Sequence, residues 1–166
     1  MPLSPADLDD VHAIQSDPGT WEHLPSGRPT DINSTRRVIE MSEASWSAHG
    51  FGLWTIRLPD GTVAGTCGAF VNALPVWNLG YRLSPAVWGH GLASEVAVAA
   101  VEAAQAADLT LPVVARVLST NPASSRVAAK AGLTLRWRGR PTEGPKRLIH
   151  ADRALEPELL RALAAL

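Results

Sequence analysis

The sequence predicts an α/β (α+β) fold in a single domain spanning 1–166. Three observations support this prediction. A chain of 166 residues with 46% apolar composition suits one globular domain that is large enough to bury a core. Two β-like segments flank Pro59-Asp60-Gly61, which is a strong hairpin signal. Further along, a β-like segment leads into a long helical segment at Leu92, and a second unit of this kind begins at Leu111.

The chain is predicted to begin with a helix followed by a loop. Ser4 suits a helix N-cap with Pro5 at the first helical position, and this helix ends near Asp17-Pro18-Gly19. Prolines and a glycine interrupt Trp21–Thr30, which is therefore predicted as a loop. Loops of this kind often contact ligands.

A second helix is predicted over Asp31–Ala48, with Asn33 or Ser34 as its cap and His49-Gly50 as its end. Six strands are expected, at Phe51–Leu58, Thr62–Phe70, Val76–Leu83, Leu111–Leu118, Leu133–Arg138 and Lys146–Leu155. The last two flank a turn at Gly139–Gly144. Three further helices are expected, at Leu92–Ala107, Ala123–Ala131 and Glu156–Leu166.

The most informative stretch is the glycine turn Trp88-Gly89-His90-Gly91-Leu92-Ala93, which joins a strand to the long helix. Glycine lets the backbone bend and approach a ligand closely. The helix N-terminus offers unpaired N–H groups and a partial positive charge, which suit a phosphate or pyrophosphate. The alternative is that the two glycines only shape a strand-to-helix turn.

Two other phosphate-binding motifs do not fit this turn. A P-loop needs a Lys-Ser/Thr pair after its last glycine, where this chain has Leu92-Ala93. A dinucleotide fingerprint needs a third glycine where Ser94 stands, and Asp108 precedes the next strand instead of ending it.

The overall charge excludes some partners. The net charge is −1 and the pI is about 6.5, so nothing predicts nucleic-acid or membrane binding. The single cysteine, Cys67, has no partner for an internal disulfide and no zinc-ligand spacing, so it is predicted to be a core residue. The N-terminus lacks a signal peptide pattern, and a cytoplasmic protein is expected.

Two groups of motifs, about 30 residues apart, resemble the GNAT acyltransferases. The first joins Gly80-Tyr81-Arg82-Leu83 to the glycine turn, and the second joins Asn121-Pro122-Ala123-Ser124 to Lys130-Ala131-Gly132-Leu133. Within that superfamily the chain looks like the RimJ/RimL-like branch, which acetylates the N-termini of ribosomal proteins. The resemblance implies a mixed, mainly antiparallel central sheet with flanking helices, splayed where acetyl-CoA binds.

The resemblance also implies site residues. Backbone at Arg82 and Leu83 would pair with the pantetheine arm, Asn121 would contact it from the other side, and Ser124 would lie near the thioester sulfur. The glycine turn would bind the pyrophosphate through main-chain N–H groups. The implied acetyl-CoA site comprises Arg82, Leu83, Trp88, Gly89, His90, Gly91, Leu92, Ala93, Asn121 and Ser124.

Four departures from the family pattern stand out. Ala86 stands at the polar position before the glycines, Ala128 replaces a tyrosine that is a general acid in many members, and Asn78 replaces a strand glutamate that serves as base. The family usually has a strand before its first helix, and only its last residues are present here. In the RimJ/RimL-like group a serine three residues after the asparagine can act as acid, which makes Ser124 the candidate.

Acetyl transfer to an amine needs a neutral amine, a polarised carbonyl and a proton for the departing thiolate. No metal is required. An α-amino group, with a pKa of about 8, demands less of a base than a lysine, with a pKa of about 10.4. Glu22 and His23 in the predicted loop are favoured as base over Glu43 and His49.

The sequence therefore predicts an N-acetyltransferase that forms a ternary complex with acetyl-CoA and a primary amine. The acceptor could be a protein N-terminus or a small molecule. The alternative is a non-catalytic acyl-CoA-binding regulatory module, and a ligand-free interaction domain is a third hypothesis. The oligomeric state is left open, a homodimer included.

Overall fold

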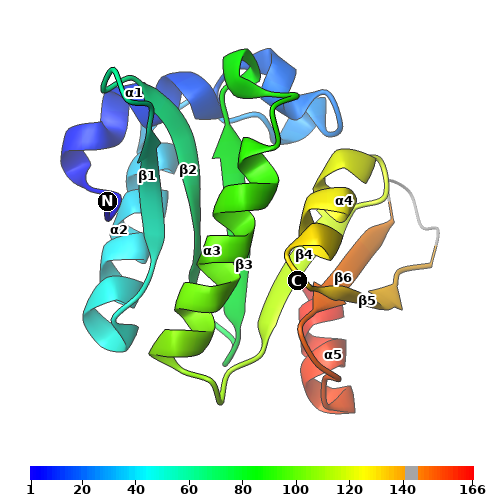
Figure 1. The fold of residues 1–166 in the computed structure, drawn as a ribbon. Coiled ribbons are helices and arrows are strands. Elements are labelled where there is room, and N and C mark those ends of the chain that lie inside the picture. The colour runs from blue at the N-terminus through cyan, green and yellow to red at the C-terminus, as the bar shows by residue number, and fades with distance from the viewer. Residues whose placement is uncertain (141–145) are drawn as a thin grey trace.

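The computed structural model describes residues 1–140 and 146–166. Within these ranges the chain forms one six-stranded sheet with helices on both faces, as Figure 1 shows. The strands are β1 Leu53–Arg57, β2 Val63–Phe70, β3 Trp77–Leu83, β4 Val113–Leu118, β5 Thr134–Arg138 and β6 Arg147–Ala151. The α-helices are α1 Leu8–Gln15, α2 Ile32–His49, α3 Leu92–Ala107, α4 Pro122–Lys130 and α5 Pro157–Ala165.

The sheet is mixed and mostly antiparallel, in the order β1-β2-β3-β4-β6-β5. The predicted hairpin pairs β1 with β2, and β3 continues the antiparallel arrangement beside β2. Of the described pairings only β3 with β4 is parallel. The predicted fold class is confirmed.

The two faces of the sheet carry different helices. On one face, α3 packs small buried side chains such as Ala97, Ala100 and Ala104 against β2, β3 and β4, and Ala128 of α4 joins the same core. On the other face, α1 and α2 cover β1 and β2, while α5 inserts Leu163 beside β4 and β6. Alanine lets α3 lie close to the sheet, because little side-chain volume separates the two layers.

The parallel pair β3–β4 is joined at one end only. Trp77 pairs with Val113 and Asn78 with Val114, and there the register ends. The remaining residues of the two strands, Leu79–Leu83 and Ala115–Leu118, have no cross-strand partner between them. The sheet is therefore split along its middle, and Figure 1 shows β3 and β4 diverging from that joined end.

Most predicted elements occur where expected, and α3 has the predicted bounds. Asn33 and Ser34 are wrong as caps of α2, because the Asp31 side chain accepts the Asn33 N–H at 3.0 Å. Strand β6 ends at Ala151 instead of Leu155, because at Asp152 the side-chain Oδ1, and not the backbone carbonyl, accepts the N–H of Val113 of β4 at 3.1 Å. Residues 141–144 of the predicted turn at Gly139–Gly144 lie outside the described residues.

The N-terminal residues extend the sheet beyond β1. Leu3 donates its N–H to Leu53 O, and Met1 O accepts the N–H of Thr55, both at 2.9 Å. Leu3 is buried in the core beneath α1 and α2. A short segment thus lies where the family pattern has its first strand.

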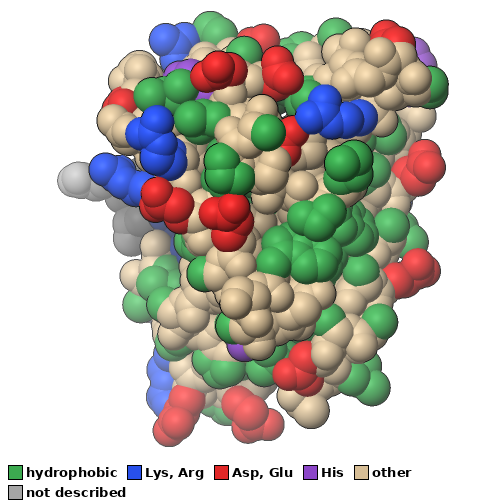
Figure 2. Space-filling model, turned by 90° about the vertical axis from the view of Figure 1, so that its left-hand side faces the viewer, with side chains coloured by type: hydrophobic (Ala, Val, Ile, Leu, Met, Phe, Trp, Pro, Cys, Tyr) green, Lys and Arg blue, Asp and Glu red, His purple; other side chains and the backbone are tan. Residues whose placement is uncertain are grey.

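Charges are mixed on the surface that can be inspected in Figure 2. Acidic and basic side chains are interspersed on that face of the molecule, so it presents no field of a single sign. Among residues 1–140 and 146–166 no helix has the length and apolar character needed to cross a membrane.

Candidate active site

A cavity of about 910 Å³ fills the split between β3 and β4. Its walls are the unpaired halves of the two strands, the glycine turn, the first turns of α3 and α4, and the loop around His23. Residues from both faces of the sheet therefore reach one cavity. Its volume lies at the upper end of the range for small-molecule sites, about 300–1,000 Å³.

The glycine turn forms the mouth of the cavity at the N-terminus of α3. Gly89 has φ of 84° and Gly91 has φ of 83°, a backbone conformation that favours glycine. A Cβ added at either position would meet no atom within 4 Å, so both face open space. In the first turn of α3 the Ser94 N–H donates to Gly91 O at 2.9 Å, whereas the N–H groups of Leu92 and Ala93 precede the first intrahelical bond and are available to an anion. These features fit the pyrophosphate of acetyl-CoA.

Inside the cavity, the Tyr81 hydroxyl of β3 meets α4. It lies 2.8 Å from both the carbonyl oxygen and the Oγ of Ser124. Since the carbonyl can only accept, Tyr81 donates to it and Ser124 Oγ donates to Tyr81. Burial raises the pKa of Tyr81 to about 12, so the phenol stays protonated at neutral pH.

Arg82 anchors the loop between α1 and α2 to β3. Its guanidinium donates to Thr20 O at 2.7 Å and lies 3.9 Å from the ring centroid of Trp21. The His23 ring also stacks on Trp21, with ring centroids 6.0 Å apart, so the indole contacts both the Arg82 cation and the imidazole. Burial first and the charge of Arg82 second lower the pKa of His23, which favours the neutral imidazole at pH 7.

Asn121 sets the geometry at the start of α4. Its side-chain oxygen accepts the Ser124 N–H at 2.9 Å and caps the helix. Nearby, the Thr120 hydroxyl donates to His23 O at 3.0 Å, which ties the two loops together across the cavity. The hydroxyl of Ser124 is thus held toward Tyr81 instead of capping its own helix.

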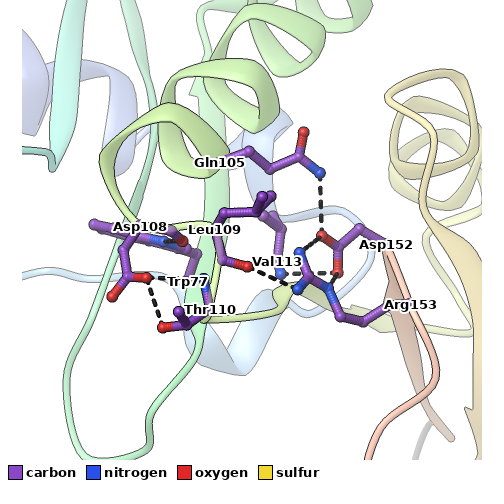
Figure 3. Close-up of polar contacts among 8 residues, drawn as sticks. All are labelled: Trp77, Gln105, Asp108, Leu109, Thr110, Val113, Asp152 and Arg153. Carbon is purple, nitrogen blue, oxygen red and sulfur yellow. Dashed lines mark hydrogen bonds and ion pairs between the residues drawn. The ribbon is translucent and has the colours of Figure 1, made fainter.

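The closed end of the split is held by a cluster of polar contacts, shown in Figure 3. Asp152 accepts from Val113 N and Gln105 Nε2, each at 3.1 Å, and from Arg153 Nη2 at 2.8 Å. Arg153 also donates to Leu109 O at 2.8 Å. These bonds attach the connection between α3 and β4 to β6 just where β3 and β4 join.

The structure brings together most of the predicted site residues. Those that line the cavity are Glu22, His23, Arg82, Leu83, Trp88, Gly89, Gly91, Leu92, Ala93, Asn121 and Ser124. His90 is exposed and its side chain is not part of the lining. Of the less favoured bases, His49 packs against Trp77 and Glu43 is exposed on α2, and neither lines the cavity.

Sequence reasoning did not identify several cavity residues as site residues, among them Tyr81, Arg116, Arg126 and Lys130. Tyr81 was treated only as part of a motif, although a tyrosine predicted on an apolar strand needs a partner for its hydroxyl. Arg116 on β4 gives no local signal, because its place at the cavity depends on the split between the strands. In the described parts of the chain no three His, Cys, Asp or Glu side chains group to hold a metal ion.

Comparison with known proteins identifies the class. The model of the Acetyltransferase (GNAT) domain matches residues 1–134. An acetyltransferase from Agrobacterium tumefaciens is 30% identical, with TM-score 0.74 over 90% of this chain and 86% of that chain. Fold and family model together define an acetyltransferase. The chain belongs to the GNAT family, whose members use acetyl-CoA.

More distant structures share the fold. The microcin C7 self-immunity acetyltransferase MccE, in complex with acetyl-CoA and AMP, is 14% identical, with TM-score 0.70 over 93% of this chain and 91% of that chain. A chimera of spermidine N-acetyltransferase SpeG from Vibrio cholerae and hSSAT is 14% identical, with TM-score 0.68 over 96% of both chains.

Proposed function

We propose that this acetyltransferase acts on a primary amine in a ternary complex with acetyl-CoA at the split between β3 and β4. The observation that carries the proposal is that one cavity joins a glycine turn at a helix N-terminus to the Tyr81–Ser124 hydroxyl pair. Such a cavity can bind phosphates at one end and place proton donors at the other.

The residues available for binding follow from the geometry. Amides of the glycine turn would hold the pyrophosphate. The edge of β3 at Arg82 and Leu83 that faces β4 has no partner strand, and it would pair with the pantetheine arm. Arg126 and Lys130 of α4 line the same cavity and can meet further phosphate. Acetyl-CoA supplies the acetyl group as a thioester, which is an activated acyl donor.

The proton movements use side chains of the cavity. His23, with its lowered pKa, or Glu22 takes the proton of the attacking amine, directly or through water. As the amine nitrogen forms its bond to the acetyl carbon, the carbon–sulfur bond breaks and its electron pair stays on sulfur. The Ser124 hydroxyl turns from Tyr81 to protonate that sulfur, and the proton taken by the base returns to Ser124 through water, so that both hydroxyls end protonated.

We further propose that the protein belongs to the RimJ/RimL-like branch and that its acceptor is an α-amino group. Ala128 and Asn78 stand where other members have a tyrosine and a glutamate, and Ser124 occupies the position of the serine acid. A weaker base suffices for an α-amino group, because its pKa is only about 8.

Calorimetric titration tests the binding half of the proposal. Wild-type protein should bind acetyl-CoA at micromolar affinity and near-stoichiometrically, with CoA and dephospho-CoA as comparators. Gly89→Asp should abolish binding by steric block and charge repulsion. Gly61→Asp is the matched control, because Gly61 has φ of 89°, open space around it, and a hairpin position outside the cavity. Equal affinity in wild type and Gly89→Asp would refute the site.

Turnover tests the catalytic half. Acetylation of a broad amine panel, followed by mass spectrometry and CoA release, separates an enzyme from an acyl-CoA-binding regulatory module. Ser124→Ala and Tyr81→Phe should each lower kcat by about 100- to 10,000-fold, the range expected when a positioned proton donor is lost. Unchanged kcat in both variants would remove this pair from the mechanism.

A further inference from the structure

Two arginines stand on opposite walls of the cavity and on one face of the sheet. Asn78 of β3 pairs with Val114 of β4, so these two side chains point to the same face of the sheet. Side chains alternate along a strand, so Arg82 points to the same face as Asn78, and Arg116 to the same face as Val114. Val114 packs against Leu163 of α5, which identifies the face as the one covered by α1, α2 and α5. Both arginines line the cavity.

Neither guanidinium has an acidic partner. Arg82 donates to the carbonyl of Thr20 and stacks on Trp21. The Nε of Arg116 is buried and has no hydrogen-bond partner. In residues 1–140 and 146–166, no carboxylate lies within 4.0 Å of either group. Buried charged groups are normally paired, because an unpaired charge is costly away from water.

The cavity is thus positive on this face. Burial lowers the pKa of Arg82 to about 10, and at neutral pH the side chain remains a cation. Burial first, and then the charge of Arg147, lower the pKa of Arg116. Glu22 is the one carboxylate among the described residues that line the cavity. An anion bound in the cavity would supply the acidic partner that both arginines lack.

The phosphates of acetyl-CoA do not account for this pair. Their proposed ligands, the glycine turn, Arg126 and Lys130, belong to α3 and α4 on the opposite face. Arg82 and Arg116 therefore remain for the second substrate. On the same face, the loop that carries Glu22 and His23 forms part of the cavity wall.

We infer that the acceptor is an amine that carries a carboxylate near its amino group, bound by Arg82 and Arg116. This inference rests on the proposed acetyl transfer and adds its substrate class. Planar guanidinium groups match a carboxylate in shape as well as charge. Glu22 can bind the ammonium group of the acceptor before that group loses its proton. A polyamine has no carboxylate, and its further ammonium groups would meet the positive charges of Arg82 and Arg116.

Matched acid and amide acceptors test the inference. One arm compares free L-amino acids with their α-carboxamides, and a second compares peptides that begin with Asp or Glu with those that begin with Asn or Gln. In at least one arm kcat/KM should favour the acid by about 10- to 100-fold, the value of a charge-assisted hydrogen-bonded pair. The arm that shows the preference identifies which carboxylate is bound.

Variants then assign that preference to the arginines. Arg82→Gln and Arg116→Gln should each reduce the acid-to-amide ratio to about 3-fold or less. Arg136→Gln is the matched control, because Arg136 is exposed on the edge strand β5 and does not line the cavity; it should keep the wild-type ratio. The wild-type protein offers a test that needs no mutation. Added salt screens the charges and should lower its acid-to-amide ratio of kcat/KM.

Three results would overturn the inference. One is an acid-to-amide ratio near 1 in both arms, and another is a ratio that survives in a folded Arg82→Gln or Arg116→Gln variant. The third is a preference for spermidine over every acid tested. In all three the proposed acetyl transfer to a primary amine stands, because amines are acetylated, although a preference for spermidine would also overturn the proposed α-amino acceptor. Binding of acetyl-CoA without acetylation of any amine would instead overturn the proposed function, and this inference with it.

Discussion

Replacing Asp152 with alanine should destabilise the protein by about 3 kcal/mol. The side chain is 8% exposed and accepts hydrogen bonds from Val113 N, Gln105 and Arg153 (Figure 3). Without it, the buried N–H of Val113 loses its side-chain acceptor, which costs about 1–3 kcal/mol. The partly exposed Arg153 pair adds up to about 1 kcal/mol, and the Gln105 bond about 0.5 kcal/mol.

Thermal and chemical denaturation measure this loss. For a chain of this size about 3 kcal/mol corresponds to a fall in Tm of about 6–12 °C. Arg153→Ala removes only the half-exposed partner and should cost less than about 1 kcal/mol. Asp152→Asn keeps an oxygen for Val113 N and should fall between the two. A loss below about 0.5 kcal/mol in Asp152→Ala, or equal losses in Asp152→Ala and Arg153→Ala, would refute the assignment of Val113 as the costly partner.

Three further predictions concern the rest of the fold. Gly65→Ala should cost more than about 4 kcal/mol, because its Cβ would lie 2.2 Å from Arg82 O at φ of 142°, and a soluble variant with wild-type Tm would contradict this. Cys67 should resist thiol reagents in the native state, since burial raises the pKa of its thiol to about 12, and react fully in denaturant; rapid native labelling would disprove it. For Asp7, burial alone would raise the pKa of the carboxyl, but hydrogen bonds from Thr55 and Ser4 outweigh it, so the pKa lies below its ordinary value. Its contribution is therefore present above about pH 4 and lost as the pH falls further, and Asp7→Asn should flatten the acid side of the stability profile.

Local signals account for most of the elements. The apolar and alanine-rich period of α3, with Gly91 before it, predicted both of its ends, and Pro59-Asp60-Gly61 predicted the hairpin of β1 and β2. Such signals are patterns among residues that are close in sequence, so they can be identified without knowledge of the tertiary structure. The N-cap of α2 was wrong because several polar residues in a row can cap, and backbone geometry selects among them.

The end of β6 depended on contacts distant in sequence. Asp152 leaves the strand to accept from Val113, 39 residues earlier in the chain. No periodicity within Lys146–Leu155 encodes that partner. Strand ends of this kind are decided by hydrogen bonds across the fold, which must satisfy buried backbone groups.

By itself the sequence determined the alternation of strands and helices and the glycine turn before α3, because each of these is a property of a few adjacent residues. Only the tertiary structure decided which side chains meet in the cavity. Two strands that pair at Trp77–Val113 and Asn78–Val114 and then separate bring Tyr81 to Ser124 and leave Arg82 and Arg116 facing one space. That arrangement follows from where pairing stops, which is set by packing over the whole sheet and not by any local pattern.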